Sequence, residues 1–185
     1  MALTKTPVCN FGKKAEDFKL KSIENKIISL NDVKGEKATL IMFICNHCPY
    51  VKAIILDLAK DCNELKKDGI NSVAIMSNDT KNYPEDSFDN MIKFAKTNNF
   101  GEINYLIDET QEIARKYGAV CTPDFFGYNK ELKLQYRGRF RELKDLKPVS
   151  GGDSDLKIAM KMISETQAGP KEQIPSMGCN IKWVN

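Results

Sequence analysis

Two cysteines separated by two residues lie at the junction of two different hydrophobic patterns. The pentapeptide is Cys45-Asn46-His47-Cys48-Pro49. Before it, residues 40–44 form a continuous apolar run, which is typical of a strand buried on both faces. After it, apolar residues between positions 51 and 65 recur at helical spacing. A CxxC placed between a strand and a helix predicts thiol–disulfide chemistry, because the pair closes a small ring and a helix start favours a thiolate.

The order of the residues predicts a different role for each cysteine. Cys45 is expected to be the exposed, attacking thiolate, and Cys48 the more buried thiol that resolves a mixed disulfide. His47, the only histidine in the chain, is expected to place a donor or a positive charge near the Cys45 sulfur. That interaction would lower the pKa of Cys45 and make the disulfide more oxidising. The alternative for His47 is an exposed loop residue with no role.

Metal binding is an alternative use of the same residues. Cys45, Cys48 and His47, together with Cys121, offer soft ligands for Cu(I) or zinc. A structural zinc site takes four ligands, usually as two closely spaced pairs. The sequence has no second CxxC and no HxxxH. We therefore expect no metal and no cofactor, with a metal-binding protein as the alternative.

Composition excludes several kinds of partner. The 185 residues include 28 basic and 25 acidic ones, a net charge of +3, and the basic residues are scattered, so we expect no nucleic acid partner. No segment approaches the ~20 apolar residues of a membrane span, and the N-terminus shows no apolar signal region. Six widely spread cysteines suit a reducing compartment, so we expect a cytoplasmic protein acting on protein or low-molecular-weight thiols and disulfides. Nothing in the sequence predicts an oligomeric state.

The predicted elements follow the order β-α-β-α-β-α-β-β-α after an N-terminal hairpin over residues 18–30. Strands are expected at 40–44, 72–76, 103–107, 125–128 and 132–136, and helices at 51–65, 88–95, 110–117 and 153–166. Two βαβ crossovers followed by a hairpin and a helix predict an α/β fold, a thioredoxin-like three-layer α/β/α sandwich with a mixed central sheet. Residues 1–185 are expected to form one such domain, with a C-terminal tail, residues 168–185, docked on it.

A second group of residues, Cys121-Thr122-Pro123, opens the strand at 125–128. Pro123 is predicted to follow a cis peptide bond. In a sheet of this topology the loop lies against the CxxC, so Thr122 and Pro123 are expected to bind substrate, with the Thr122 backbone pairing with an incoming peptide. Cys121 is either an additional redox cysteine or a small buried apolar residue. Cys179, in the tail, is a further candidate for an additional redox role.

Several motifs, in order, resemble the peroxiredoxin-like, thioredoxin-fold family of the alkyl hydroperoxide reductase and thiol-specific antioxidant (redoxin) superfamily. They are Cys45-Asn46-His47-Cys48-Pro49, Ser77-Asn78-Asp79, Tyr83-Pro84-Glu85-Asp86-Ser87, Tyr117-Gly118-Ala119-Val120-Cys121-Thr122-Pro123-Asp124, Tyr136-Arg137-Gly138-Arg139, and the tail from Pro175 to Trp183. The resemblance implies a thioredoxin fold in which the CxxC is the redox centre and the Thr122-Pro123 loop lies beside it.

The chain departs from this resemblance at positions that matter for peroxide chemistry. Peroxiredoxins carry a threonine three residues, and a proline seven residues, before their peroxide-attacking cysteine. Counted from Cys45, these positions hold Met42 and Ala38. Thioredoxins carry a buried aspartate six residues before the first cysteine, where this chain has Thr39. The favoured function is thus thiol–disulfide exchange, with an atypical antioxidant thiol peroxidase, using Arg137 or Arg139, as an alternative.

We predict that hydroperoxide reduction is slow compared with dithiol exchange. Reduction of a peroxide by a thiolate needs a hydroxyl and a guanidinium that polarise the O–O bond, and Met42 cannot donate a hydrogen bond. Stopped-flow oxidation of the reduced protein by hydrogen peroxide should give a second-order rate near that of a free thiol at the same pH. A rate far above that value would contradict the prediction and favour the peroxidase alternative.

Overall fold

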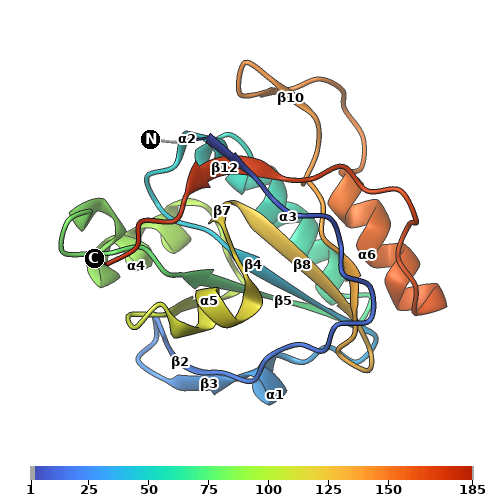
Figure 1. Ribbon diagram of the computed structural model, residues 1–185, viewed down its shortest axis with the longest axis horizontal. Helices are drawn as coiled ribbons and strands as arrows, with labels where there is room; N and C mark the ends of the chain where they lie inside the picture. Colours follow the sequence, from blue (N-terminus) through green and yellow to red (C-terminus); the bar gives the residue numbers. More distant parts are fainter. Residues whose placement is uncertain (1–2, 185) are drawn as a thin grey trace.

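The computed structural model of the chain describes residues 3–184 and is built around a seven-stranded mixed sheet (Figure 1). In spatial order the strands are β3 (Ile27–Ser29), β2 (Lys19–Ser22), β6 (Asn104–Ile107), β5 (Ile70–Met76), β4 (Ala38–Phe43), β8 (Asp124–Asn129) and β9 (Leu134–Tyr136). β4, β5 and β6 are parallel, and the strands outside them pair antiparallel. The mixed sheet predicted from the order of elements is confirmed.

Two helical layers cover this sheet, so the three-layer prediction is also correct. The helices are α1 (Leu30–Val33), α2 (Pro49–Lys52), α3 (Ile55–Lys66), α4 (Phe88–Thr97), α5 (Glu112–Tyr117) and α6 (Asp155–Thr166), with a 3₁₀ turn, η1 (Pro84–Asp86). β4 is buried on both faces because its side chains alternate between two cores. Leu40 and Met42 pack in the core that contains α3, α4 and α6, whereas Ile41 and Phe43 pack in the core that contains α1 and α5.

The helix predicted over residues 51–65 is divided in two. α2 begins at Pro49, where a missing N–H costs nothing, and ends at Lys52. Ile54 leaves the helical conformation, with φ −121° and ψ −12°, before α3 begins at Ile55. The break puts α2 at the CxxC as a separate turn, while α3 runs along the sheet.

All helices in the described part of the chain are short. The longest two, α3 and α6, have 12 residues each. Within residues 3–184, no helix has the length and apolar character needed to cross a membrane.

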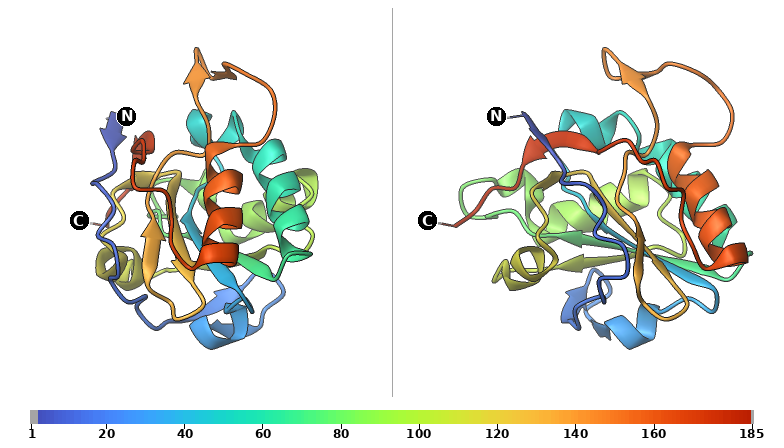
Figure 2. Two further views of the ribbon diagram at one scale, coloured as in Figure 1. Left: turned by 90° about the vertical axis from the view of Figure 1, so that its right-hand side faces the viewer. Right: turned by 45° about the vertical axis from the view of Figure 1, so that its right-hand side comes forward.

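The C-terminal strand β12 (Met177–Asn180) belongs to a second, three-stranded sheet that the sequence did not predict. It lies between β1 (Leu3–Lys5) and β7 (Cys121–Thr122), antiparallel to both (Figures 1 and 2). A two-stranded hairpin, β10 (Leu143–Lys144) and β11 (Lys147–Pro148), projects away from the main sheet (Figure 2). β12 therefore joins both ends of the described chain to the loop that contains Pro123.

We predict that Gly178→Ala destabilises this second sheet. A Cβ at position 178 would overlap the carbonyl oxygen of Thr122 and crowd the ring of Pro123, so β12 would have to move. The free energy of unfolding should fall by about 1–3 kcal/mol, measured by urea denaturation. Gly151→Ala is the matched control, because a Cβ there meets nothing within 4 Å, and its effect should stay within about 0.5 kcal/mol. Equal stability of the two variants would contradict the prediction.

Candidate active site

Both cysteines of the CxxC are buried free thiols at the end of β4. Cys45 follows β4, and Cys48 is the N-cap of α2. The exposed fractions of the two residues are 1 % and 0 %. The expectation of an exposed Cys45 is therefore wrong for this conformation. The reason is tertiary: both residues pack in a core cluster that also contains Cys179 from β12.

One residue, Thr122, contacts both sulfurs. Its hydroxyl lies 3.3 Å from Cys45 Sγ, and its carbonyl oxygen lies 3.2 Å from Cys48 Sγ. The peptide bond between Thr122 and Pro123 is cis, as predicted. The loop predicted to lie against the CxxC does so, and through both its side chain and its backbone.

A third sulfur completes the cluster. Cys179 Sγ lies 3.0 Å from Cys48 Sγ, and both residues are buried. Cys121, by contrast, points its thiol toward the carbonyl oxygen of Pro123, 3.6 Å away, and burial raises the pKa of this thiol. Of the two additional redox candidates from the sequence, the structure brings Cys179 into contact with the CxxC, whereas the Cys121 thiol, among residues 3–184, donates only to the Pro123 carbonyl.

Hydrogen bonding favours the thiolate on Cys48 in this conformation, not on Cys45 as the sequence predicted. The neighbouring Cys45 thiol, then the Cys179 thiol and the backbone N–H of Val51, lower the pKa of Cys48 to about 5 against the opposing effect of burial. The neighbouring Cys48, burial and the carboxylate of Asp86 raise the pKa of Cys45. As a thiol, Cys48 donates to the Thr122 carbonyl; as a thiolate, it accepts from these neighbours.

Asp86 lies at the candidate site, although the sequence did not single it out as a site residue. It is fully buried and accepts three hydrogen bonds, from the backbone N–H of Asn46 (2.8 Å), from Asn78 Nδ2 (2.8 Å) and from His47 Nδ1 (2.7 Å). Because a carboxylate only accepts, Nδ1 of His47 must carry the proton. His47 and Asp86 are 39 positions apart in the sequence, so no local sequence pattern indicates that they are in contact.

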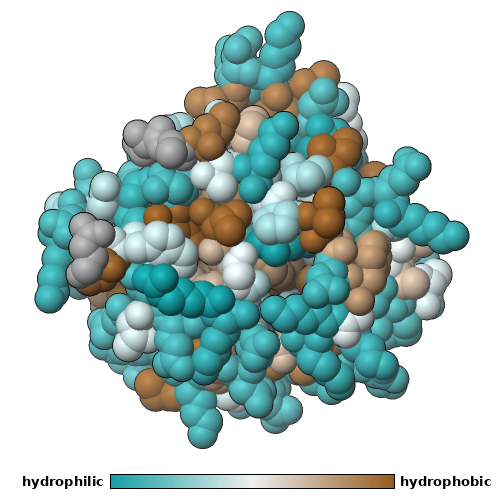
Figure 3. All heavy atoms as spheres, viewed as in Figure 1, coloured by the Kyte–Doolittle hydropathy of each residue, from teal (hydrophilic) through white to brown (hydrophobic). Residues whose placement is uncertain are grey.

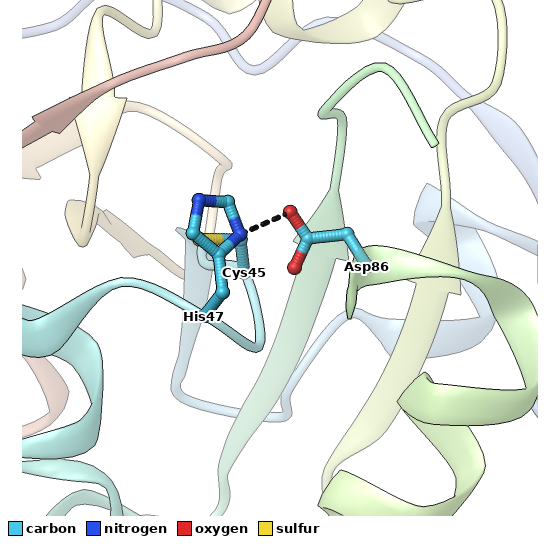
Figure 4. Close-up of side chains that lie close together, drawn as sticks. All are labelled: Cys45, His47 and Asp86. Carbon is cyan, nitrogen blue, oxygen red and sulfur yellow. Dashed lines mark hydrogen bonds and ion pairs between the residues drawn. The ribbon is translucent and has the colours of Figure 1, made fainter. Parts of the chain in front are cut away.

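Cys45, His47 and Asp86 converge at one point (Figure 4). Each offers one ligand atom, and these three atoms lie within 4.8 Å of one another. The His47 ring also stacks on Tyr83, with centroids 5.6 Å apart. The sequence predicted that His47 would act on the Cys45 sulfur directly; the polar contact of its ring in the structure is with Asp86, whose charge it offsets beside Cys45.

The arginines considered for peroxide chemistry are engaged elsewhere. Arg137 pairs with buried Asp124, with Nη2 and Oδ2 2.9 Å apart, and donates to the Gly118 carbonyl. Burial raises the pKa of Asp124 to about 6, although Arg137 opposes the shift. Arg139 pairs with Asp155 at 2.6 Å. Neither guanidinium therefore contributes to a peroxide cradle at Cys45 in this conformation.

A cavity of about 450 Å³ opens beside Pro123. It is bounded by α2, the β10–β11 hairpin and residues 174–177 of the C-terminal tail. Its lining includes Tyr50, Pro123, Arg139 and the exposed apolar side chains of Ile174 and Met177. On the face that carries β1 and β12, Figure 3 shows hydrophobic residues in small groups separated by hydrophilic ones. Because Pro123 is part of its lining, a partner in this cavity would contact the Pro123 loop.

The backbone edge that was expected to bind a substrate peptide is occupied. Cys179 pairs with Thr122, and Asn180 with Cys121, in the antiparallel ladder between β12 and β7. An incoming peptide cannot pair with Thr122 while β12 stays in place. The sequence could not reveal this, because the pairing joins segments more than 50 residues apart.

Comparison with known proteins agrees with this architecture. The AhpC/TSA family pattern matches residues 11–139, and the chain belongs to this family. An uncharacterised conserved protein from Geobacillus kaustophilus is 39% identical, with a TM-score of 0.94 and coverage of 100% of this chain and 97% of that one. A hypothetical protein from Sinorhizobium meliloti 1021 is 36% identical, with a TM-score of 0.90 and 98% coverage of each chain. Among curated proteins, no sequence matched the chain.

A more distant likeness supports the fold. The thioredoxin domain of a thiol-disulfide oxidoreductase from Bacteroides vulgatus is 19% identical, with a TM-score of 0.58, over 69% of this chain and 86% of that domain. The predicted thioredoxin-like fold and redoxin family are confirmed. At the level that the family supports, the protein is an oxidoreductase of the redoxin type.

We predict that Cys179→Ala raises the pKa of Cys48. The substitution removes the Cys179 thiol that favours the Cys48 thiolate, and a shift of about one unit corresponds to one hydrogen bond to a charged group. Absorbance at 240 nm of the reduced protein, followed against pH, reports the thiolate. Cys62→Ala is the control, because burial raises the pKa of Cys62 to about 12. The same first titration step in both variants would contradict the prediction.

We also predict that Asp86→Asn destabilises the site. Asp86 accepts from three donors, and an amide would turn its own N–H₂ toward at least one of them. The free energy of unfolding should fall by about 1–3 kcal/mol, measured by denaturant titration. Asp89→Asn, which makes the same charge change at an exposed position of α4, should have little effect. An unchanged free energy of unfolding in Asp86→Asn would show that these hydrogen bonds do not stabilise the protein.

Proposed function

We propose that the protein is a thiol–disulfide oxidoreductase whose redox centre is the Cys45–Cys48 pair. The main support is that Thr122 contacts both thiols, with its hydroxyl 3.3 Å from Cys45 Sγ and its carbonyl oxygen 3.2 Å from Cys48 Sγ. Membership of the redoxin family and the thioredoxin-like fold support this chemistry.

The reaction is a two-electron exchange between this pair and a partner disulfide. A thiolate of the pair attacks one sulfur of the partner, forms a mixed disulfide and releases the other partner sulfur as a thiolate. The second cysteine then attacks the first, which closes the Cys45–Cys48 disulfide and releases the partner as a dithiol. Two thiols are oxidised and one disulfide is reduced. The reverse direction serves when the pair starts oxidised.

We assign the first attack to Cys45 and the second to Cys48. In the closed conformation the thiolate rests on Cys48, partly because of contacts from Cys179. Movement of β12 removes those contacts and uncovers the Thr122 edge at the same time. Exposure to water then relieves the burial that raises the pKa of Cys45, while His47 donates to the Asp86 carboxylate beside it. Proteins and small disulfides are the substrates that this site suits.

The test is reduction of insulin by dithiothreitol in the presence of the protein, followed by turbidity. Cys45→Ser and Cys48→Ser should each abolish the catalysed rate, because each removes one sulfur of the exchange. Cys62→Ala, a buried thiol of α3, should retain it. Disulfide mapping after mild oxidation should show Cys45 linked to Cys48. Full activity of Cys45→Ser or of Cys48→Ser would contradict the proposal.

Metal binding is a second candidate, favoured by the convergence of Cys45, His47 and Asp86. A cation there would have to replace the hydrogen bond between His47 and Asp86. Metal analysis of protein purified without chelator separates the two functions. Stoichiometric zinc or copper that is lost in His47→Ala would favour the metal site, whereas metal-free protein with a reversible disulfide favours the exchange reaction.

A further inference from the structure

Cys179 is held in place from both sides. On one side, Ser176 Oγ donates to the carbonyl oxygen of Pro123 at 2.8 Å, and its own carbonyl accepts from the backbone N–H of Thr6 at 2.9 Å. On the other, the backbone carbonyl of Lys182 accepts from Asp79 N and Gln111 Nε2, each at 2.8 Å. The sulfur that lies 3.0 Å from Cys48 Sγ is therefore carried by an anchored strand.

The fit of β12 is close as well as fixed. Gly178 allows the strand to approach the Thr122 carbonyl more closely than any side chain permits. That approach brings the next residue, Cys179, opposite Thr122 in the ladder. The result is a tail segment that lies where a substrate strand would pair, with a cysteine facing the redox pair. β12 thus occupies the position that a bound substrate strand would occupy.

We propose that Cys179 is a third redox cysteine, which exchanges with the Cys45–Cys48 disulfide to form an intramolecular Cys48–Cys179 disulfide. The inference rests on the proposed function, because it starts from that disulfide. The contact between Cys48 and Cys179 sulfurs carries it. Cys121 is also buried, but its thiol donates a hydrogen bond to the Pro123 carbonyl. We assign no such role to Cys121.

The exchange needs no external oxidant. The thiolate of Cys179 attacks Cys48 Sγ, the Cys48–Cys179 bond forms, and the Cys45–Cys48 bond breaks. Cys45 leaves as a thiolate and takes up the proton that Cys179 released. The number of disulfides and electrons stays constant. The product keeps the tail covalently closed over Thr122 and leaves Cys45 as the free sulfur beside His47.

The first experiment traps the product in the unaltered protein. The reduced chain is treated with oxidised glutathione, quenched with N-ethylmaleimide, digested and mapped by mass spectrometry. We expect two singly oxidised species, one linked through Cys45–Cys48 and one through Cys48–Cys179 with Cys45 alkylated. Cys179→Ala should lose the second species completely and retain the first. A wild-type map with no link to Cys179 would overturn the proposal.

The second experiment removes the competing sulfur. Cys45→Ser should form the Cys48–Cys179 disulfide in full under the same oxidation, because Cys48 has no other thiol in contact. Adding Cys179→Ala should abolish the link, whereas adding Cys121→Ala, the matched control, should leave it intact. A link from Cys48 to Cys121, or Cys48 carrying only glutathione, would overturn the proposal. Circular dichroism checks that each variant is folded. The disulfide map of the wild-type protein tests the proposal independently of the variants.

The two proposals fail in different ways. Absence of the Cys45–Cys48 disulfide in Cys179→Ala would count against the oxidoreductase function itself. Its presence there, combined with no Cys48–Cys179 link in Cys45→Ser, would leave that function standing and reject only the role of Cys179.

Discussion

The contacts of Thr122 with the two sulfurs of the CxxC organise the rest of the site. Its hydroxyl meets Cys45, its carbonyl meets Cys48, and its backbone pairs with Cys179. Thr122 ends β7, and the cis peptide bond to Pro123 follows it directly before β8 begins. Everything that reaches the redox pair along this edge must compete with β12 for the same backbone groups. Access to the pair is thus a question of strand exchange at Thr122.

Charge is controlled from a different element. Asp86, in the 3₁₀ turn before α4, is buried and satisfied by three donors. A buried carboxylate near a thiol disfavours a second negative charge, so the position of His47 between them has a direct electrostatic consequence. The thiolate is favoured on Cys48, where the Cys45 thiol, then Cys179 and the backbone N–H of Val51, lower the pKa. Local sequence order suggests the opposite assignment, because it lacks the carboxylate.

Much of the fold could be read from the chain because its signals are local. Continuous apolar runs identify β4 and β5, and glycines with positive φ, Gly69 and Gly118, follow α3 and α5. The prediction erred where distant segments decide the outcome. The second sheet of β1, β12 and β7 joins remote parts of the chain, whereas the break at Ile54 has no signal in the apolar pattern of residues 51–65. Apolar tail residues predicted contact with the body, but not which strand they would pair with.

In the candidate site, too, some features follow from local sequence and others only from the tertiary structure. The sequence by itself determined the CxxC between a strand and a helix, the cis proline loop and the family, because these are motifs of neighbouring residues with their own conformational preferences. Only the tertiary structure decided that both thiols are buried, that Asp86 stands beside Cys45, and that Cys179 rather than Cys121 touches the pair. The physical reason is that pairing across 50 or more residues is fixed by the packing of the whole sheet, which no short pattern encodes.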